Sequence, residues 1–397
     1  MKPIRLLYLT YNENPVGSGI LRVQVRKMLE ALVRLEGIEA VRLVSFISPR
    51  LKRNQIEALA KLEKELESRH IEFSVRLMPA ATAWGWPALL LMSPFCLPTL
   101  NKEIDDFRPT VLHSRSYAAG WLAHKASTTR KIPTIFDPRG PYPEEMVANG
   151  RWRSKGISYR IWKSIEGRLV QESGAVVGVT PDYRDEFRDR EAVKSVFIPN
   201  RCDLAAFPVL ERAFRTDDPL MAFVGEMDSK WYSPEYIGRH FLLLRRSIPN
   251  LRFLVVTRRD PAYIREGFRK IGIPDEAWES KGVPPEDVPA LLNRASLGLV
   301  AMDKTNVWPV KFAEYLAAGV PVIIHRGAGR LICSIVEKKR LGIVIDIDEP
   351  ESYQSAVNLL SDLPAYRKRC RDYAVQRLSI ESTARQYRRL YRSVAGI

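Results

Sequence analysis

The feature that most constrains the fold is an alternation of short apolar strands with helical segments along nearly the whole chain. Successive parallel strands need a crossover connection, and a helix usually supplies it. Such alternation therefore predicts a parallel sheet with helices on both faces. In the first half, the predicted strands are "IRLLYL" (4–9), "AVRLVSFI" (40–47), "IEFSVRL" (71–77), "TVLHS" (110–114), "PTIFD" (133–137), "GAVVGVT" (174–180) and "SVFIP" (195–199).

A second series of strands begins after a polar, irregular stretch at 200–219. Its runs are almost continuously apolar, which is typical of strands buried on both faces. With 397 residues, the chain suits two domains. We predict two Rossmann-like, doubly wound domains, 1–205 and 206–379, that face a cleft, with a final helix at about 380–397 packing back on the first. The second-half strands are predicted at 220–225, 251–257, 296–302, 320–325 and 341–346.

Charge and composition narrow the function classes. A net charge of +16 calls for an anionic partner, and nucleic acid, anionic lipid and phosphorylated small molecules all fit. No recognisable nucleic-acid module accompanies the basic residues, so lipid or small molecule is favoured. Four scattered cysteines indicate a reducing compartment, and five histidines show no metal-binding spacing. The N-terminus lacks a secretory signal, so we expect a cytoplasmic protein that can associate peripherally with the inner face of a membrane. Much of the positive charge lies in the last thirty or so residues, at Arg367, Lys368, Arg369, Arg371, Arg377, Arg385, Arg388, Arg389 and Arg392.

One segment, Thr82–Leu100, departs from the alternation because it is rich in Trp, Leu, Met and Pro. Its prolines and modest length argue against a transmembrane helix. Two readings stay open. The segment forms a buried helical hairpin in the first domain, or it forms an apolar lip that dips into a membrane surface or binds a lipid-linked substrate.

A short helix is predicted from Pro309 to Ala318, closed by Gly319. Lys311 lies in its first turn, where the positive end of the helix dipole disfavours a cation. A phosphate bound at this helix N-terminus would turn Lys311 into a counter-ion, and Glu314 could accept two ribose hydroxyls. The alternative is that both charges only solvate an exposed face. By helical spacing, that outer face carries Lys311, Glu314, Tyr315 and Ala318, and the inner one Phe312, Ala313, Leu316 and Ala317.

Two further loops follow predicted strands. "FDPRGPYPEE" places Asp137 and Arg139 at the carboxyl edge of the first sheet, where a carboxylate could act as a base and an arginine could neutralise phosphate. The same pair could simply fix the proline-rich turn. After the first strand, the glycines of 17–19 would let backbone amides approach a ligand, or form an ordinary turn. His113, alone in an apolar strand, reads as a core residue.

Several of these stretches resemble one family. "PVKFAEYLAAGVPVI" is similar to the nucleotide-sugar signature of GT-B glycosyltransferases, and most of all to the large retaining family of bacterial enzymes that build surface polysaccharides. "VFIPNRCDLAAF", "GVPPEDVPALLNRASLGLVAM" and "IPTIFDPRGPYPEE" resemble other stretches of that group in order and spacing. The resemblance covers most of the chain and is more specific in its second half.

The resemblance implies an enzyme that moves a sugar from a nucleoside-diphosphate sugar, most often UDP-linked, to a saccharide or lipid-linked acceptor, without metal or other cofactor. It makes the first domain the acceptor side and the second the donor side. Asp137, Arg139 and Arg115 are the implied catalytic residues. The implied donor-binding residues are Glu314 for the ribose, Lys311 for the diphosphate, and Lys230, Gly17, Ser18, Gly19, Val283 and Arg258.

The sequence departs from the family pattern at three places. Asn306 stands where many retaining members have the first acid of E-x7-E. Glu226 occupies the usual arginine position after the first donor-domain strand, and Arg115 stands where a histidine is common. Two alternatives therefore stay open: a non-catalytic nucleotide-binding partner protein, and a GT-B-type sugar-nucleotide epimerase.

Overall fold

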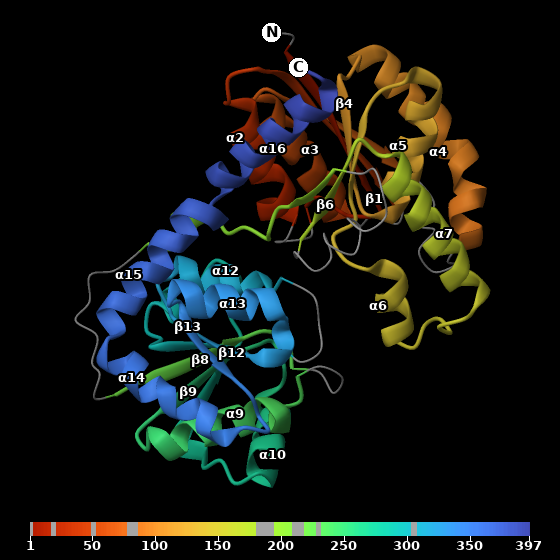
Figure 1. Cartoon of the computed structure of the whole chain (residues 1–397). Helices are drawn as coiled ribbons and strands as arrows, with labels where there is room; N and C mark the ends of the chain where they lie inside the picture. The colour runs from red at the N-terminus through yellow and green to blue at the C-terminus, as the bar shows by residue number, and fades with distance from the viewer. Residues whose placement is uncertain are drawn as a thin grey trace. The chain divides into compact units, whose positions relative to one another are not determined.

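The computed structural model describes residues 3–16, 21–48, 53–77, 86–179, 194–208, 218–227, 232–302 and 308–397, the side chains of 86–92 excepted. The chain forms two compact units (Figure 1). Unit 1 comprises Met1–Pro199 and Ile380–Ile397, and unit 2 comprises Asn200–Ser379. The first break falls slightly before the predicted one at 205/206, because Cys202 already pairs with Ser379 in an isolated parallel bridge of unit 2.

Unit 1 is built on a seven-stranded sheet in the order β3-β2-β1-β4-β5-β6-β7, and its paired strands are all parallel. The strand order reverses between β1 and β4. Its strands are β1 (Ile4–Tyr11), β2 (Ile38–Ile47), β3 (Ile71–Leu77), β4 (Val111–Arg115), β5 (Thr134–Asp137), β6 (Ala175–Gly178) and β7 (Ser195–Phe197). Its helices are α2 (Lys27–Val33), α3 (Arg53–Glu67), α4 (Trp86–Phe107), α5 (Tyr117–Arg130), α6 (Tyr142–Ala148), α7 (Ile157–Glu172) and α16 (Ile380–Ala395).

Strand β1 shows why this sheet is covered on both sides. Leu6 and Tyr8 belong to a core shared with α2, α3 and α16, whereas Leu7 and Leu9 belong to a core shared with α4 and α5. Side chains alternate along a strand, so an unbroken apolar run needs a helical layer on each face. The last helix, α16, joins the first of these layers, and Figure 1 shows it in blue beside α2.

Helix α4 corrects one prediction. Residues 86–107 form one helix and not a hairpin, while 82–85 lie outside the described residues. The helix tolerates Pro94 and Pro98 because both lie on its exposed side, together with Phe95, whereas Cys96 and Leu100 are buried. Among the helices of the described residues, none is long and apolar enough to cross a membrane.

Unit 2 contains a six-stranded parallel sheet in the order β10-β9-β8-β11-β12-β13, reversing between β8 and β11. Five of its strands were predicted; the sixth, Trp278–Lys281, was missed because "WESK" is short and mostly polar, as edge strands often are. Its strands are β8 (Leu220–Val224), β9 (Arg252–Val256), β10 (Trp278–Lys281), β11 (Leu297–Val300), β12 (Val322–His325) and β13 (Gly342–Ile345). Its helices are α9 (Pro234–Ser247), α10 (Pro261–Lys270), α11 (Val288–Leu292), α12 (Val310–Ala317), α13 (Arg330–Lys339), α14 (Ser355–Ser361) and α15 (Leu363–Tyr373).

The prediction of two Rossmann-like parallel-sheet domains is thus confirmed. In open sheets of this kind, ligands bind outside the carboxyl ends of the strands, next to the point where the strand order reverses. Each unit has one such point, at β1/β4 and at β8/β11. These two edges are the candidate ligand-binding regions of the fold.

Candidate functional site

The edge of unit 2 is defined by α12, which follows β11. The helix runs from Val310 to Ala317 and starts one residue later than predicted, because Pro309 has an extended backbone (φ −66°, ψ 131°) and caps the helix instead of opening it. The chain before it is held by Asn200, whose Nδ2 donates to the carbonyl of Trp308 at 2.8 Å. Trp308 is buried and packs edge-on against Phe312. The helix start is therefore anchored by Asn200, the first residue of unit 2.

Lys311 and Glu314 contact each other on the accessible side of α12. Lys311 Nζ donates to Glu314 Oε2 at 2.7 Å, and the two side chains are 37% and 20% exposed. Both alternatives from the sequence are compatible with this pair, since it neutralises the misplaced cation without removing it from solvent. A ligand that carries hydroxyls and a phosphate could replace this ion pair, with a hydroxyl donating to Glu314 and the phosphate accepting from Lys311.

Tyr315 corrects the predicted outer face, because it is completely buried. Its hydroxyl accepts from the Val224 amide at 3.0 Å and lies 3.3 Å from the carbonyls of Ala222 and Leu299. The ring fits because residue 298 is glycine: a Cβ there would lie 2.6 Å from Tyr315 Cγ. The signature tyrosine therefore fastens α12 to β8 and β11.

The far end of α12 is closed by arginines from α15. Gly319 has the left-handed conformation (φ 68°) that ends the helix, as predicted. Arg367 donates to the carbonyls of Ala295 at 2.9 Å and Ala318 at 3.4 Å, and Arg371 donates to the carbonyl of Ala317. Burial lowers the pKa of Arg367 to about 10. These two cations, which the sequence grouped with a basic membrane-facing tail, instead occupy the negative end of a helix dipole.

The other predicted donor residues lie after neighbouring strands or outside the described residues. Val283, partly exposed, follows β10. Arg258 follows β9, is 83% exposed, and pairs with Glu226 at 3.1 Å, so a cation does stand beside the glutamate found at the usual arginine position. Lys230, Gly17, Ser18, Gly19 and Asn306 lie outside the described residues.

The edge of unit 1 is marked by strained backbone. Seven non-glycine residues have positive φ, and four of them follow helices, at 70, 108, 131 and 340. The remaining three follow three adjacent strands: Asn12 (φ 55°) after β1, Ser116 (φ 71°) after β4, and Arg139 (φ 68°) just after β5. Strain of this kind costs on the order of 1–3 kcal/mol per residue and tends to gather at functional sites.

Asp137 and Arg139 do lie together at this edge. Arg139 Nη1 is 3.3 Å from Asp137 Oδ2, and Arg139 Nη2 donates to Gln24 Oε1 at 3.4 Å, from a π-helical turn ahead of α2. Asp137 is fully buried, whereas the Arg139 side chain is 15% exposed. Of this pair, only the arginine is accessible to solvent. Burial by itself would raise the pKa of the Asp137 carboxyl, but Arg139, the hydrogen bond from His113 and Arg115 outweigh it and hold the pKa well below its usual range.

Arg115 ends β4 and is also buried, 4% exposed. Its Nε donates to Glu13 Oε2 at 2.7 Å. Burial would lower its pKa, but the charge of Glu13 outweighs this and raises it. Within the described ranges, Arg115 Nη1 and the hydroxyl of Tyr8 are buried without a hydrogen-bond partner. Two hydrogen-bond donors at this edge therefore lack an acceptor among those residues.

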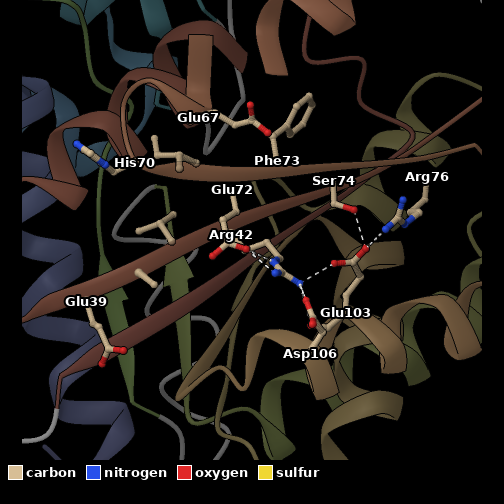
Figure 2. A pocket seen from close by; sticks show the side chains of 13 residues that line it. Glu39, Arg42, Glu67, His70, Glu72, Phe73, Ser74, Arg76, Glu103 and Asp106 are labelled. Atoms are coloured by element: carbon tan, nitrogen blue, oxygen red, sulfur yellow. Dashed lines mark hydrogen bonds and ion pairs between the residues drawn. The ribbon is translucent and has the colours of Figure 1, made fainter. Parts of the chain in front are cut away.

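A cavity of about 550 Å³ lies elsewhere on unit 1 (Figure 2). Its walls come from the start of β2, from β3 and from the end of α4, which places it toward the amino edge of the sheet. Arg42 donates there to Glu103 at 3.0 Å and Asp106 at 2.8 Å. Its acids are largely satisfied by arginines, and it lies away from the edge where such sheets bind ligands, so we assign no function to it.

Two kinds of residue at these edges were missed in the sequence. Tyr387 and Tyr391 of α16 are buried against the unit 1 edge, where Tyr391 Oη lies 2.7 Å from Nδ1 of the equally buried His113. Their four-residue spacing, which puts them on one face of a helix, was the signal that could have found them. Asn200 was seen only as part of a linker motif. No group of three or more His, Cys, Asp or Glu suited to a metal ion occurs within the described residues.

Comparison with known proteins gives a match for each unit. Residues 21–201 match the Glycosyl transferase 4-like domain family, and residues 211–377 match the family Glycosyl transferases group 1. A search of curated proteins gave no significant match.

Several solved structures share the whole fold. They include sucrose-phosphate synthase from Thermosynechococcus elongatus (17% identity, TM-score 0.70, 100% of both chains covered). A glycosyltransferase from Rickettsia africae is 13% identical, with a TM-score of 0.66 and 99% of each chain covered. HepE of Anabaena, solved in complex with UDP, is 12% identical, with a TM-score of 0.64 over 99% of this chain and 100% of that one. Together, a glycosyltransferase family on each unit and this shared two-domain fold show that the chain belongs to the GT-B glycosyltransferases.

Proposed function

We propose that the protein transfers a sugar from a nucleoside-diphosphate sugar, with UDP as the most favoured nucleotide, to a saccharide or lipid-linked acceptor in surface polysaccharide synthesis. The observation that carries the proposal is the start of α12. A helix N-terminus opens beside the β8/β11 reversal point, with Lys311 and Glu314 accessible on it. HepE, which shares the fold, is a protein solved with UDP and with UDP-glucose.

In this proposal, Glu314 accepts hydroxyl hydrogens from the ribose and Lys311 turns from Glu314 to the diphosphate. The leaving nucleoside diphosphate gains negative charge as the glycosidic bond breaks. The amides at the start of α12 stabilise that charge from fixed positions, and the ammonium of Lys311 adds to this once it has turned to the diphosphate. Lys230 would add a second cation. We propose that these groups suffice without a metal ion.

On unit 1 we propose that Arg139, and not Asp137, contacts the acceptor side of the reaction. Asp137 is buried and already faces several donors, so its role is to fix the arginine. Arg115 Nη1 and the Tyr8 hydroxyl, which find no hydrogen-bond partner among the described residues, favour an acceptor rich in oxygen atoms, such as a saccharide or a phosphate. We further propose that the protein works in the cytoplasm, at the inner face of the membrane.

The test is release of nucleoside diphosphate from a panel of sugar nucleotides, with and without saccharide and lipid-linked acceptors. Wild type should turn over at least one donor, and Glu314→Ala should weaken binding of the corresponding nucleoside diphosphate by about 2–4 kcal/mol, as for a charged hydrogen-bond partner. Glu266→Ala, on the exposed face of α10, is the control. Binding without turnover would favour the non-catalytic partner protein, and unchanged affinity in folded Glu314→Ala would contradict the ribose assignment.

A further inference from the structure

The last helix of the chain reaches the Asp137–Arg139 pair through two buried hydroxyls. Tyr387 and Tyr391 are both fully buried and lie four residues apart on α16, so they share one face of the helix. Tyr387 donates to Asp137 Oδ2 at 3.3 Å, and Tyr391 Oη lies 2.7 Å from His113 Nδ1. The two rings stack, with centroids 5.7 Å apart.

The protons of this network can be assigned by what each group can donate. Asp137 is ionised and only accepts. It faces Tyr387, Arg139 and Nε2 of His113, the last at 3.5 Å. In a neutral imidazole, the ring nitrogen that faces a carboxylate carries the proton, and for His113 that nitrogen is Nε2. Its Nδ1 is then an acceptor, and Tyr391 must donate to it.

The consequence of this chain of hydrogen bonds lies at Arg139. Its backbone has a left-handed conformation (φ 68°), which is costly for a non-glycine residue and persists only where surrounding contacts impose it. Its guanidinium is held by Asp137 and by Gln24. Asp137 is held in turn by Tyr387 directly and by Tyr391 through His113. Both hydroxyls therefore bear on where the guanidinium points.

We propose that Tyr387 and Tyr391 are positioning residues of the glycosyl-transfer reaction, which orient Arg139 through Asp137 and His113. The inference rests on the proposed role of Arg139. It adds that a segment at the end of the chain, after the whole of unit 2, completes the site on unit 1. Both tyrosines act through other residues and need not touch a substrate.

The test uses Tyr387→Phe and Tyr391→Phe in the full chain, which remove one hydroxyl each and keep the stacked rings. The matched control is Tyr353→Phe in unit 2, where a buried tyrosine hydroxyl makes the same kind of bond, 2.6 Å to His240 Nδ1. The first measurement is the rate at which phenylglyoxal modifies Arg139, located by mass spectrometry. We expect a two- to tenfold faster modification in both unit 1 variants, roughly the effect of losing one neutral hydrogen bond, and no change in the control.

A second measurement reads the tautomer of His113 directly. The imidazole 15N shifts of wild type should show the hydrogen on Nε2, and Tyr391→Phe should shift the ring toward a tautomer mixture, whereas Tyr353→Phe should leave it unchanged. For whichever sugar nucleotide wild type turns over, kcat/KM should fall two- to tenfold in both unit 1 variants. Equal Arg139 reactivity in all four folded proteins would overturn the inference. If wild type turns over no donor, the proposed function fails, while Arg139 reactivity still decides the positioning.

Discussion

Replacing Lys311 with alanine tests whether this lysine exists for a ligand. In the ligand-free protein, the bond to Glu314 at 2.7 Å joins two partly exposed side chains, for which an i,i+3 pair contributes about 0.3–0.5 kcal/mol. Opposing it, a cation in the first turn costs about 0.3–1 kcal/mol against the helix dipole. The two contributions nearly cancel. Lys311→Ala should therefore lie between about 0.2 kcal/mol less stable and about 0.7 kcal/mol more stable than wild type.

Binding should respond much more strongly than stability. One charge-assisted hydrogen bond to a phosphate contributes roughly 1.5–3 kcal/mol, which is about a 10- to 150-fold change in Kd. The nucleoside alone makes no such bond, so its affinity should hardly change. The variant should thus lose most of the preference of wild type for the nucleoside diphosphate over the nucleoside, without losing stability.

The assay is calorimetric titration with UDP and uridine, paired with urea unfolding of the empty proteins. Lys270→Ala is the control, because this lysine also pairs with a glutamate on a helix of unit 2 but lies on the exposed α10. It should leave both affinities unchanged. If Lys311→Ala unfolds the empty protein and keeps the diphosphate preference, then Lys311 is a structural ion-pair residue and the α12 assignment is wrong.

Three further outcomes follow from the same contacts. Gly298→Ala should destabilise unit 2 by about 1–3 kcal/mol in urea unfolding, because the new Cβ would overlap the Tyr315 ring. Asp137→Asn should lower the free energy of unfolding at neutral pH, because the folded protein depresses the pKa of Asp137. Acid-unfolding curves should show that the stability difference from wild type persists above the unfolded-state pKa of about 3.9 and narrows as pH falls below it. Co-sedimentation with anionic vesicles should be salt-sensitive and should drop in Arg385→Glu/Arg389→Glu, both exposed on α16; no binding at low salt would favour a soluble acceptor.

The fold could be predicted from the sequence because the apolar periodicity of most strands is unambiguous. The runs at 220–224 and 320–324 consist of apolar residues alone, so they leave little choice of structure. The misses have physical causes. Strand Trp278–Lys281 is an edge strand, whose outer side needs no apolar residues. The two prolines of α4 suggested a break in the helix, because the sequence does not show that both lie on its exposed side.

The candidate site was less accessible to sequence reasoning, because its decisive partners are distant in the chain. Asp137 and Arg139 were found from their place after a strand, yet nothing near them in sequence shows that Asp137 is buried beneath Tyr387. The period of 3.6 residues placed Tyr315 and Ala318 on the outer face of α12, but both are fully buried, and Tyr315 lies between two strands. Local sequence patterns indicate which residues share a face of a helix, whereas tertiary packing determines which of those side chains are buried.

The contacts that hold the two ends of α12 do not include Lys311. Its carboxyl end is closed by Gly319 and by Arg367 and Arg371, and its start is anchored by Asn200 through the Trp308 carbonyl. The helix dipole favours cations at the carboxyl end, so the arginines of α15 stabilise α12 at that end. None of these contacts involves Lys311. Under the proposed function, the bound diphosphate is the anion that Lys311 serves, so removal of Lys311 should change binding while leaving stability nearly unaltered.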